Sequence, residues 1–148
     1  KLEEWLDRGH GKCWLRRPEV AQIVEQTLLK RDGREFLMQA WVLMPNHIHL
    51  VVDVWDVPLV TLIHRWKGAS SRMANTQLGR RGRFWQADYF DTLVRDADQL
   101  RKAICYTEQN PVKAFFVKTS REWVWSSARH RNEFGRLPWE RDSQERDL

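Results

Sequence analysis

The chain has 148 residues, the size of one domain, and no apolar run approaches the roughly 20 residues that cross a bilayer. With 42% hydrophobic and 30% charged residues, its composition excludes a membrane protein and a disordered tail. Two cysteines are too few for a disulfide framework, and no signal peptide is found, so a cytoplasmic protein is expected.

Lys and Arg outnumber Asp and Glu by 25 to 20. The excess is concentrated in residues 57–87, which contain no acidic residue and which we call the basic segment. Its basic residues are Arg65, Lys67, Arg72, Arg80, Arg81 and Arg83. Because these charges cluster while the rest of the chain is nearly neutral, they predict contact with a polyanion.

Pro18 opens a predicted helix over residues 18–30, since proline fits the first helical turn. Strands are expected over 35–44 and 46–54, joined as a hairpin by the Pro45-Asn46 turn. A helix, a loop, a strand and a final helix should follow, over residues 57–78, 79–83, 89–94 and 96–109.

The last helix is expected to begin at Asp96 or Asp98 and to stop before Asn110-Pro111. Residues 1–17 read as a connector and residues 128–148 as a C-terminal tail. Together these elements predict a single α+β domain, with an antiparallel sheet that carries helices on one face.

His47 and His49 are the sharpest chemical feature. They lie two residues apart in a predicted strand, so both imidazoles project from the same face. Such a pair chelates a divalent metal when a third ligand arrives from another element, although most His-x-His pairs are incidental. A buried strand face rarely accepts two unpaired histidines, which favours a metal site.

Tyr106 lies in the last predicted helix, with Gln109 and Asn110 one turn further on. In one interpretation, its ring packs against the sheet and its hydroxyl is hydrogen-bonded at the edge. In the other, its oxygen attacks a phosphodiester beside a bound metal. Both interpretations stay open at this point.

The basic segment also contains aromatic residues, and basic groups beside aromatic rings suit single-stranded nucleic acid. The alternative is a solvated helix face with tryptophans in the core. For the loop 79–83, arginines between glycines favour nucleic acid. The candidate DNA contacts are Arg65, Trp66, Lys67, Arg72, Arg80, Arg81, Arg83 and Trp85.

Several stretches between residues 14 and 127 resemble, in order, the REP-associated tyrosine transposases, which belong to the IS200/IS605-like, single-tyrosine branch of the HUH endonucleases. These stretches are AWVLMPNHIHLVV, LIHRWK, FWQADYFDTLVRD, YTEQNPVKAFFV and WVWSS. The resemblance implies a ferredoxin-like sheet, with the two histidines on a central strand and the tyrosine on a flanking helix.

The resemblance also implies metal-dependent cleavage and joining of single-stranded, hairpin-forming repeat DNA. Tyr106 would form a 5′-phosphotyrosine intermediate, and His47, His49 and Asn110 would hold Mg²⁺ or Mn²⁺, with Gln109 as the alternative third ligand. It implies a bacterial, nucleoid-associated protein without membrane contact or small-molecule cofactor, and it leaves room for self-association.

The chain departs from the family pattern at two places. Family domains usually begin with a Tyr-x-x-Thr strand beside the histidine strand, and residues 1–17 show none, so that strand is expected to be missing. The tyrosine helix carries Glu108 and Gln109 where relatives often have His or Asn. The carboxylate would either help to bind the metal or face solvent.

Two further functions remain as alternatives. One is a domesticated DNA-binding module with the same fold and little or no cleavage. The other is a metal-dependent hydrolase of a small substrate, with Asp53 as the carboxylate on the histidines' strand face.

Overall fold

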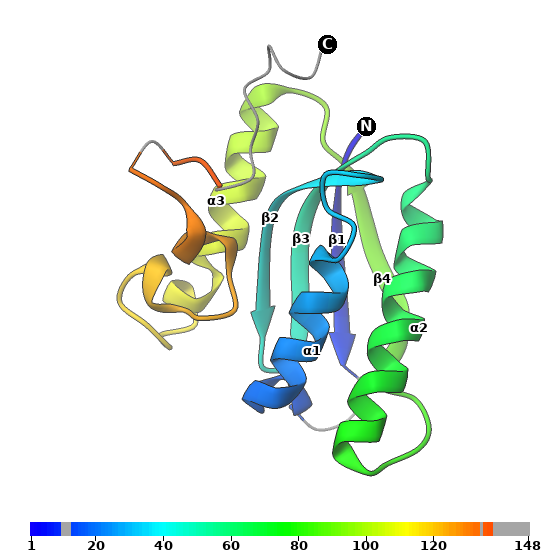
Figure 1. Ribbon diagram of the computed structural model, residues 1–148. Coiled ribbons are helices and arrows are strands. Elements are labelled where there is room, and N and C mark those ends of the chain that lie inside the picture. Colours follow the sequence, from blue (N-terminus) through cyan, green and yellow to red (C-terminus); the bar gives the residue numbers. More distant parts are fainter. Residues whose placement is uncertain (10–12, 134, 138–148) are drawn as a thin grey trace.

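The computed structural model describes residues 1–9, 13–133 and 135–137 (Figure 1). A four-stranded antiparallel sheet has the order β2-β3-β1-β4. In that order the strands are Phe36–Met44, His47–Val54, Leu2–Gly9 and Trp85–Leu93. The helices are α1 (Pro18–Leu29), α2 (Leu59–Leu78) and α3 (Ala97–Lys113), with short 3-10 turns η1 (Trp14–Arg16), η2 (Ser120–Glu122) and η3 (Ser127–His130).

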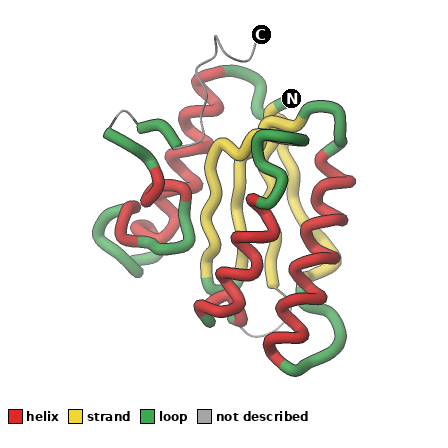
Figure 2. Tube along the Cα trace, viewed as in Figure 1, coloured by secondary structure: helices red, strands yellow, loops and turns green. Residues whose placement is uncertain are grey.

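Helices cover both faces of the sheet (Figure 2). Alternate residues of β3, Ile48, Leu50 and Val52, pack in the main core beneath α1 and α2. On the opposite face, Val51 packs with Ala103 of α3 in a smaller cluster. The α+β class with an antiparallel sheet is confirmed, whereas the expectation that the helices share one face is wrong for α3.

The first strand is present, which corrects the connector expected over residues 1–17. β1 lies between β3 and β4 and pairs antiparallel with both. Its apolar alternation is broken by charged residues, which hid the strand in the sequence. Three of these charges have a clear structural reason, because Asp7 pairs with Lys67 beneath α2, and Glu4 and Arg8 face a groove on the other side.

α3 is longer at its C-terminal end than predicted. Asp96 caps its start by accepting a hydrogen bond from the Gln99 backbone, as one of the two expected caps. The helix then continues through Pro111 to Lys113. Proline removes one N–H donor, but the ladder resumes with the bond from Ala114 N to Asn110 O.

The chain after α3 packs against the sheet instead of forming a tail from residue 128. Ala128 and Leu137 are buried, and Arg131 pairs with the buried Glu108. The part of the expected tail over residues 138–148 lies outside the described residues. No helix in the described part of the chain is long and apolar enough to cross a membrane.

Candidate active site

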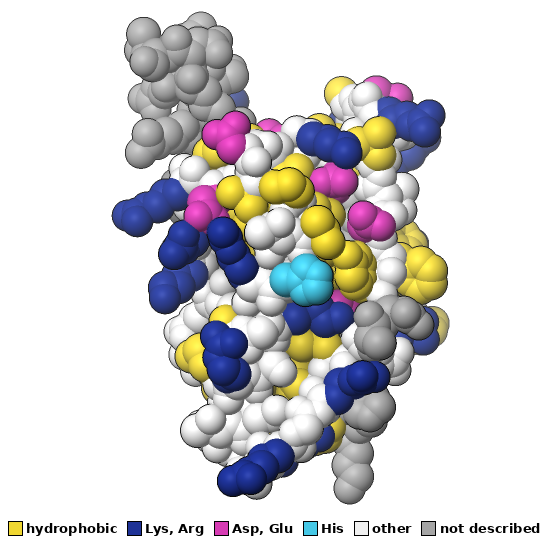
Figure 3. All heavy atoms as spheres, turned by 90° about the vertical axis from the view of Figure 1, so that its right-hand side faces the viewer, with side chains coloured by type: hydrophobic (Ala, Val, Ile, Leu, Met, Phe, Trp, Pro, Cys, Tyr) yellow, Lys and Arg dark blue, Asp and Glu magenta, His cyan; other side chains and the backbone are white. Residues whose placement is uncertain are grey.

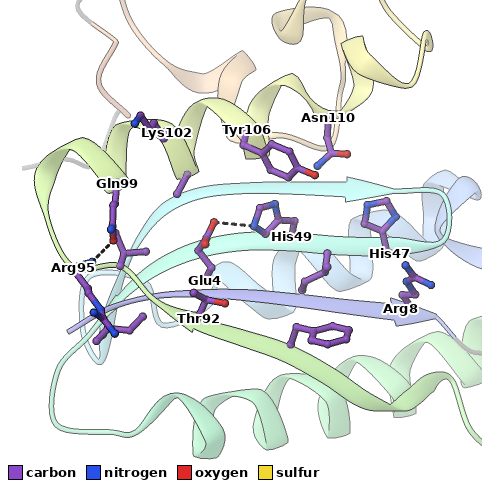
Figure 4. Close-up of a pocket in the computed structure, with 15 residues that line it drawn as sticks. Glu4, Arg8, His47, His49, Thr92, Arg95, Gln99, Lys102, Tyr106 and Asn110 are labelled. Carbon is purple, nitrogen blue, oxygen red and sulfur yellow. Dashed lines mark hydrogen bonds and ion pairs between the residues drawn. The ribbon is translucent and has the colours of Figure 1, made fainter.

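A groove of about 890 Å³ lies on the α3 side of the sheet (Figure 4). β1, β3, β4 and α3 all contribute to its walls. It brings together three side chains singled out from the sequence, His47, His49 and Tyr106, together with Asn110. Gln109 is not among the residues that line the groove. The candidate chemistry is therefore gathered at one place, with Asn110 as the helix amide that faces it.

His49 is nearly buried and has a neighbour at each ring nitrogen. Its Nδ1 lies 3.2 Å from the Thr107 hydroxyl, and its Nε2 lies 3.3 Å from Oε1 of Glu4. The Thr107 hydroxyl is also 2.7 Å from the Ala103 carbonyl, which can only accept, so its one hydrogen is donated there. Its oxygen then accepts from Nδ1–H of His49, which leaves the Nε2 lone pair facing the Glu4 carboxylate. A neutral His49 with its proton on Nδ1 therefore presents two acceptor atoms to each other, and either a proton on Nε2 or a metal cation satisfies both.

His47 begins β3 and has a different environment. Its Nδ1 lies 2.8 Å from Oδ1 of Asn46, and Arg8 is its cross-strand partner. Burial, and then the charges of Arg8 and His49, lower the pKa of His47 below 6.5. Burial also lowers the pKa of His49, against the opposite effect of Glu4. A lowered pKa favours the neutral form of each imidazole, which is the form in which histidine binds metals.

Tyr106 points from α3 toward the histidine strand (Figure 4). It is 55% exposed, and its ring meets the His49 ring edge-on with the centroids 5.7 Å apart. The ammonium of Lys113 lies 4.5 Å from the centre of the tyrosine ring. The phenol is thus held by its ring while its oxygen remains accessible to a substrate.

The groove is predominantly basic. Arg8, Arg95 and Lys102 line it, and Glu4 is the one acidic residue among the described lining residues. Within the described part of the chain, Arg8 makes no ion pair. A free guanidinium beside His47 suits a phosphate.

Sequence patterns did not single out Glu4, Arg8 or Thr107. The strand β1 was missed, and the one signal for Thr107 was its position next to Tyr106.

The helical part of the basic segment lies on the other face of the sheet. Trp66 is 6% exposed and stacks on Trp5, and Trp85 is 4% exposed and donates to Ser70. Neither ring is available to a base, so both tryptophans belong to the core and their predicted DNA contact is wrong.

Two of the predicted cations in α2 are engaged within the protein. Lys67 lies 2.9 Å from the buried Asp7 carboxylate, and Arg65 pairs with Glu35. Arg72 is exposed and makes no ion pair among the described residues. Of the three α2 cations proposed as DNA contacts, Arg72 is thus the one without an ion pair in the described part of the chain.

The arginines of the loop after α2 also differ in their surroundings. Arg80 lies 4.1 Å from the Trp14 ring centre and bonds to Asn75, so it has a packing role that was not expected. Arg81 and Arg83 are exposed. In the lower half of the face that Figure 3 shows, most charged side chains are Lys or Arg.

This loop lies at the end of the sheet where the histidine strand begins. Gly9 of β1 donates to the Asn46 carbonyl, just before His47, and pairs with Trp85 of β4, two residues after the loop. The free arginines of the loop are therefore near the histidine end of the groove, although α2 itself covers the opposite face.

Two carboxylates considered from the sequence lie outside the groove. Asp53 pairs with the amino group of Lys1 at the far end of β3. Glu108 is buried between Arg131 and Ser127, so it neither faces solvent nor approaches the histidines. Among the described residues, no three His, Cys, Asp or Glu side chains converge as a metal site. A metal in the groove would therefore need the Asn110 amide or a shift of Glu4.

Residues 16–110, more than half of the chain, match the family model "Transposase IS200 like", so the chain belongs to the IS200-like transposase family. It is 29% identical over 101 residues to the REP-associated tyrosine transposase of Escherichia coli K12, covering 67% of this chain and 58% of that protein. A relative in Haemophilus influenzae is 27% identical over 96 residues, covering 57% and 54%. The chain thus spans little more than half the length of these curated relatives.

The fold also has a counterpart among solved structures. A REP-associated tyrosine transposase bound to a REP hairpin superposes with a TM-score of 0.75 at 20% identity, covering 95% of this chain and 86% of that one. The IS200-like family and the α+β fold with an antiparallel sheet, both expected from the sequence, are confirmed.

Proposed function

We propose that this domain is a single-stranded DNA endonuclease and strand transferase that uses Tyr106 as its nucleophile. The observation that carries this proposal is the meeting of Tyr106 with His47 and His49 in one basic groove. Family membership supports action on DNA, and the groove supplies the chemical groups that a phosphodiester transfer needs.

In the proposed reaction, the Tyr106 oxygen loses its proton and attacks the phosphorus of the bound strand. A new bond joins the tyrosine oxygen to phosphorus, and the bond to the 3′ oxygen breaks. The products are a 5′-phosphotyrosine and a 3′ oxygen that takes up a proton. Because the phosphoester is conserved, a second 3′-hydroxyl can reverse the step and join strands. Arg8 and Lys113 are placed to offset the phosphate charge.

His47, His49 and Asn110 would hold Mg²⁺ or Mn²⁺, with Glu4 as a further candidate donor. Neutral imidazole nitrogens with amide and carboxylate oxygens form a donor set that Mn²⁺ accepts, and the contact of two acceptors at His49 and Glu4 fits a cation there. When bound, such an ion polarises the phosphate and offsets the charge that develops on its oxygens.

The proposed substrate is hairpin-forming repeat DNA with an unpaired flank. The E. coli relative is REP-associated, and the structural counterpart is bound to a REP hairpin. Arg81 and Arg83 are exposed in the loop near the histidine end of the groove, where they would contact phosphates of the hairpin, and Arg72 is a further exposed cation on the other face of the sheet.

A second function, a DNA-binding module with little or no cleavage, is favoured by one observation, the absence of a preformed three-residue acidic or histidine cluster in the described residues. The test is incubation with hairpin-bearing single strands and Mn²⁺, followed by a denaturing gel. A covalent protein–DNA adduct that disappears with EDTA supports the nuclease. Salt-sensitive binding with no adduct in any divalent metal would support the binding module instead.

A further inference from the structure

Phe115, just past the end of α3, combines two unfavourable features. Its side chain is 94% exposed, and its backbone has φ of 62°. Among the described residues it is the one non-glycine residue with positive φ. An exposed aromatic ring gains little from folding, and positive φ costs stability for a residue with a Cβ. A residue with both features indicates a role in binding, because it does not stabilise the fold.

The strain arises from the way α3 ends. Phe116 N donates to Pro111 O, and Phe115 N donates to Val112 O, both at 3.0 Å. These two bonds form a Schellman motif in which Phe115 holds the left-handed position that glycine usually fills. Glycine would close the helix equally well without strain. The helix end therefore does not require the phenylalanine ring.

Phe115 is adjacent in sequence to an aromatic surface, formed by Phe116 and Trp123, that is fixed at the end of the sheet where the histidine strand begins. The neighbouring Phe116 stacks on Trp123, with centroids 5.5 Å apart and an interplanar angle of 19°. Trp123 Nε1 donates to Leu43 O at 2.9 Å, close to the turn that leads into His47. The surface is thus held near the groove by a hydrogen bond to β2.

The charge around this surface is positive. Residues 109–121 contain no acidic residue, and their cations are Lys113, Lys118 and Arg121. Glu122, the next residue, is engaged by the backbone N–H groups of residues 118 and 119. Exposed aromatic rings among cations suit a single nucleic-acid strand, where bases stack and phosphates pair with the cations.

We propose that Phe115 stacks on an unpaired base of the DNA strand whose phosphate lies at Tyr106. This assignment rests on the proposed function and extends it to a base contact outside the groove. The connection is structural, because Tyr106 lies on α3 and Phe115 directly follows the C-terminal cap of this helix, with the Lys113 ammonium over the Tyr106 ring between them in sequence. Tyr106 and Lys113 are seven helical positions apart, a rise of roughly 10 Å, which one strand can span.

The test compares Phe115→Gly and Phe115→Trp with the wild-type chain, using a fluorescent DNA hairpin with an unpaired flank in EDTA, so that binding is measured without cleavage. Glycine removes both the ring and the strain, whereas tryptophan keeps a stacking ring. Phe115→Gly should weaken binding about 5- to 100-fold while raising the Tm by about 2–5 °C. Phe115→Trp should bind within about threefold of wild type. Val60→Ala, an exposed apolar residue of α2, is the matched control and should leave affinity unchanged.

A series of single abasic positions along the flank then identifies the stacked base. At one position, the abasic DNA should bind wild type and Phe115→Gly equally. Wild-type-like binding by Phe115→Gly, a lowered Tm for that variant, or a difference that no abasic position removes would overturn the assignment. Failure of the wild-type chain to bind any such DNA would instead overturn the proposed function, and the stacking contact with it.

Discussion

The Thr107 hydroxyl lies 3.2 Å from Nδ1 of His49, so the residue after Tyr106 fixes the histidine that faces it. Thr107→Val keeps the side-chain shape and removes this partner. Because partners of ligating histidines typically contribute 10- to 100-fold, we expect Mn²⁺ affinity, measured by calorimetry, to fall by about tenfold. Thr107→Ser keeps the hydroxyl and should stay near wild type. Equal Mn²⁺ affinity in the valine variant would show that the contact does not orient a metal ligand.

The contact between Glu4 and His49 gives a second prediction. If the two acceptors share a cation, Glu4→Gln should reduce Mn²⁺ affinity by about tenfold or more, because it removes a negative ligand. Glu3→Gln is the control, since Glu3 lies on the opposite face of β1. A loss of affinity in both variants would indicate a general charge effect, and a loss in neither would remove Glu4 from the donor set.

The charged residues of β1 explain why its two site residues, Glu4 and Arg8, could not be predicted from the sequence. The histidine pair and the tyrosine were found because strand alternation and helical spacing place them. In β1, charges on both faces conceal the alternation, and two of them have partners far away in sequence. Asp7 is paired with Lys67 of α2, and Glu4 with His49 of β3. Partners at such separations leave no local signal.

The Asp7–Lys67 pair gives a stability prediction. Asp7 is fully buried, and burial raises the pKa of its carboxyl above the usual 3.8 while Lys67 acts in the opposite direction. Lys67→Met leaves a buried carboxylate unpaired and should cost on the order of 3 kcal/mol in the free energy of unfolding at pH 7. Lys67→Arg keeps the charge and should cost less.

The stability deficit of the Lys67→Met variant should also change with pH in a defined direction. Without Lys67, the pKa of Asp7 in the folded state rises further above its unfolded value, so the folded chain binds the proton more tightly. The stability deficit of Lys67→Met relative to wild type should therefore be largest at neutral pH and shrink as pH falls through the raised pKa. Urea unfolding at pH 7 and pH 5 measures the difference. A deficit that is equal at both pH values would mean that the carboxylate is not the cause.

The loop arginines should separate into two roles. Arg81→Ala with Arg83→Ala should weaken DNA binding and reduce the slope of log K against log salt by roughly one to two, because two phosphate contacts are lost. Arg80→Ala should mainly lower the Tm, since Arg80 covers Trp14 and bonds to Asn75. An unchanged salt slope in the double variant would place the loop outside the phosphate path.

The basic segment also shows a limit of charge counting. Its cations were correctly located in the chain, but counting cannot tell a free charge from one with a partner on another element. Lys67 and Arg65 have such partners, and Trp66 and Trp85 fill the core. The positions of Arg81 and Arg83 could be predicted because a glycine-flanked loop leaves side chains exposed.

The central proposal, that Tyr106 is the nucleophile, is tested most directly by locating the covalent bond. After reaction with hairpin DNA and Mn²⁺, nuclease and trypsin digestion should leave a nucleotide on the peptide AICYTEQNPVK, residues 103–113. We predict that fragment mass spectra place the nucleotide on Tyr106 and that Tyr106→Phe gives no adduct while binding the hairpin nearly as well as wild type. A nucleotide on another residue, or an adduct that persists in Tyr106→Phe, would contradict the proposal.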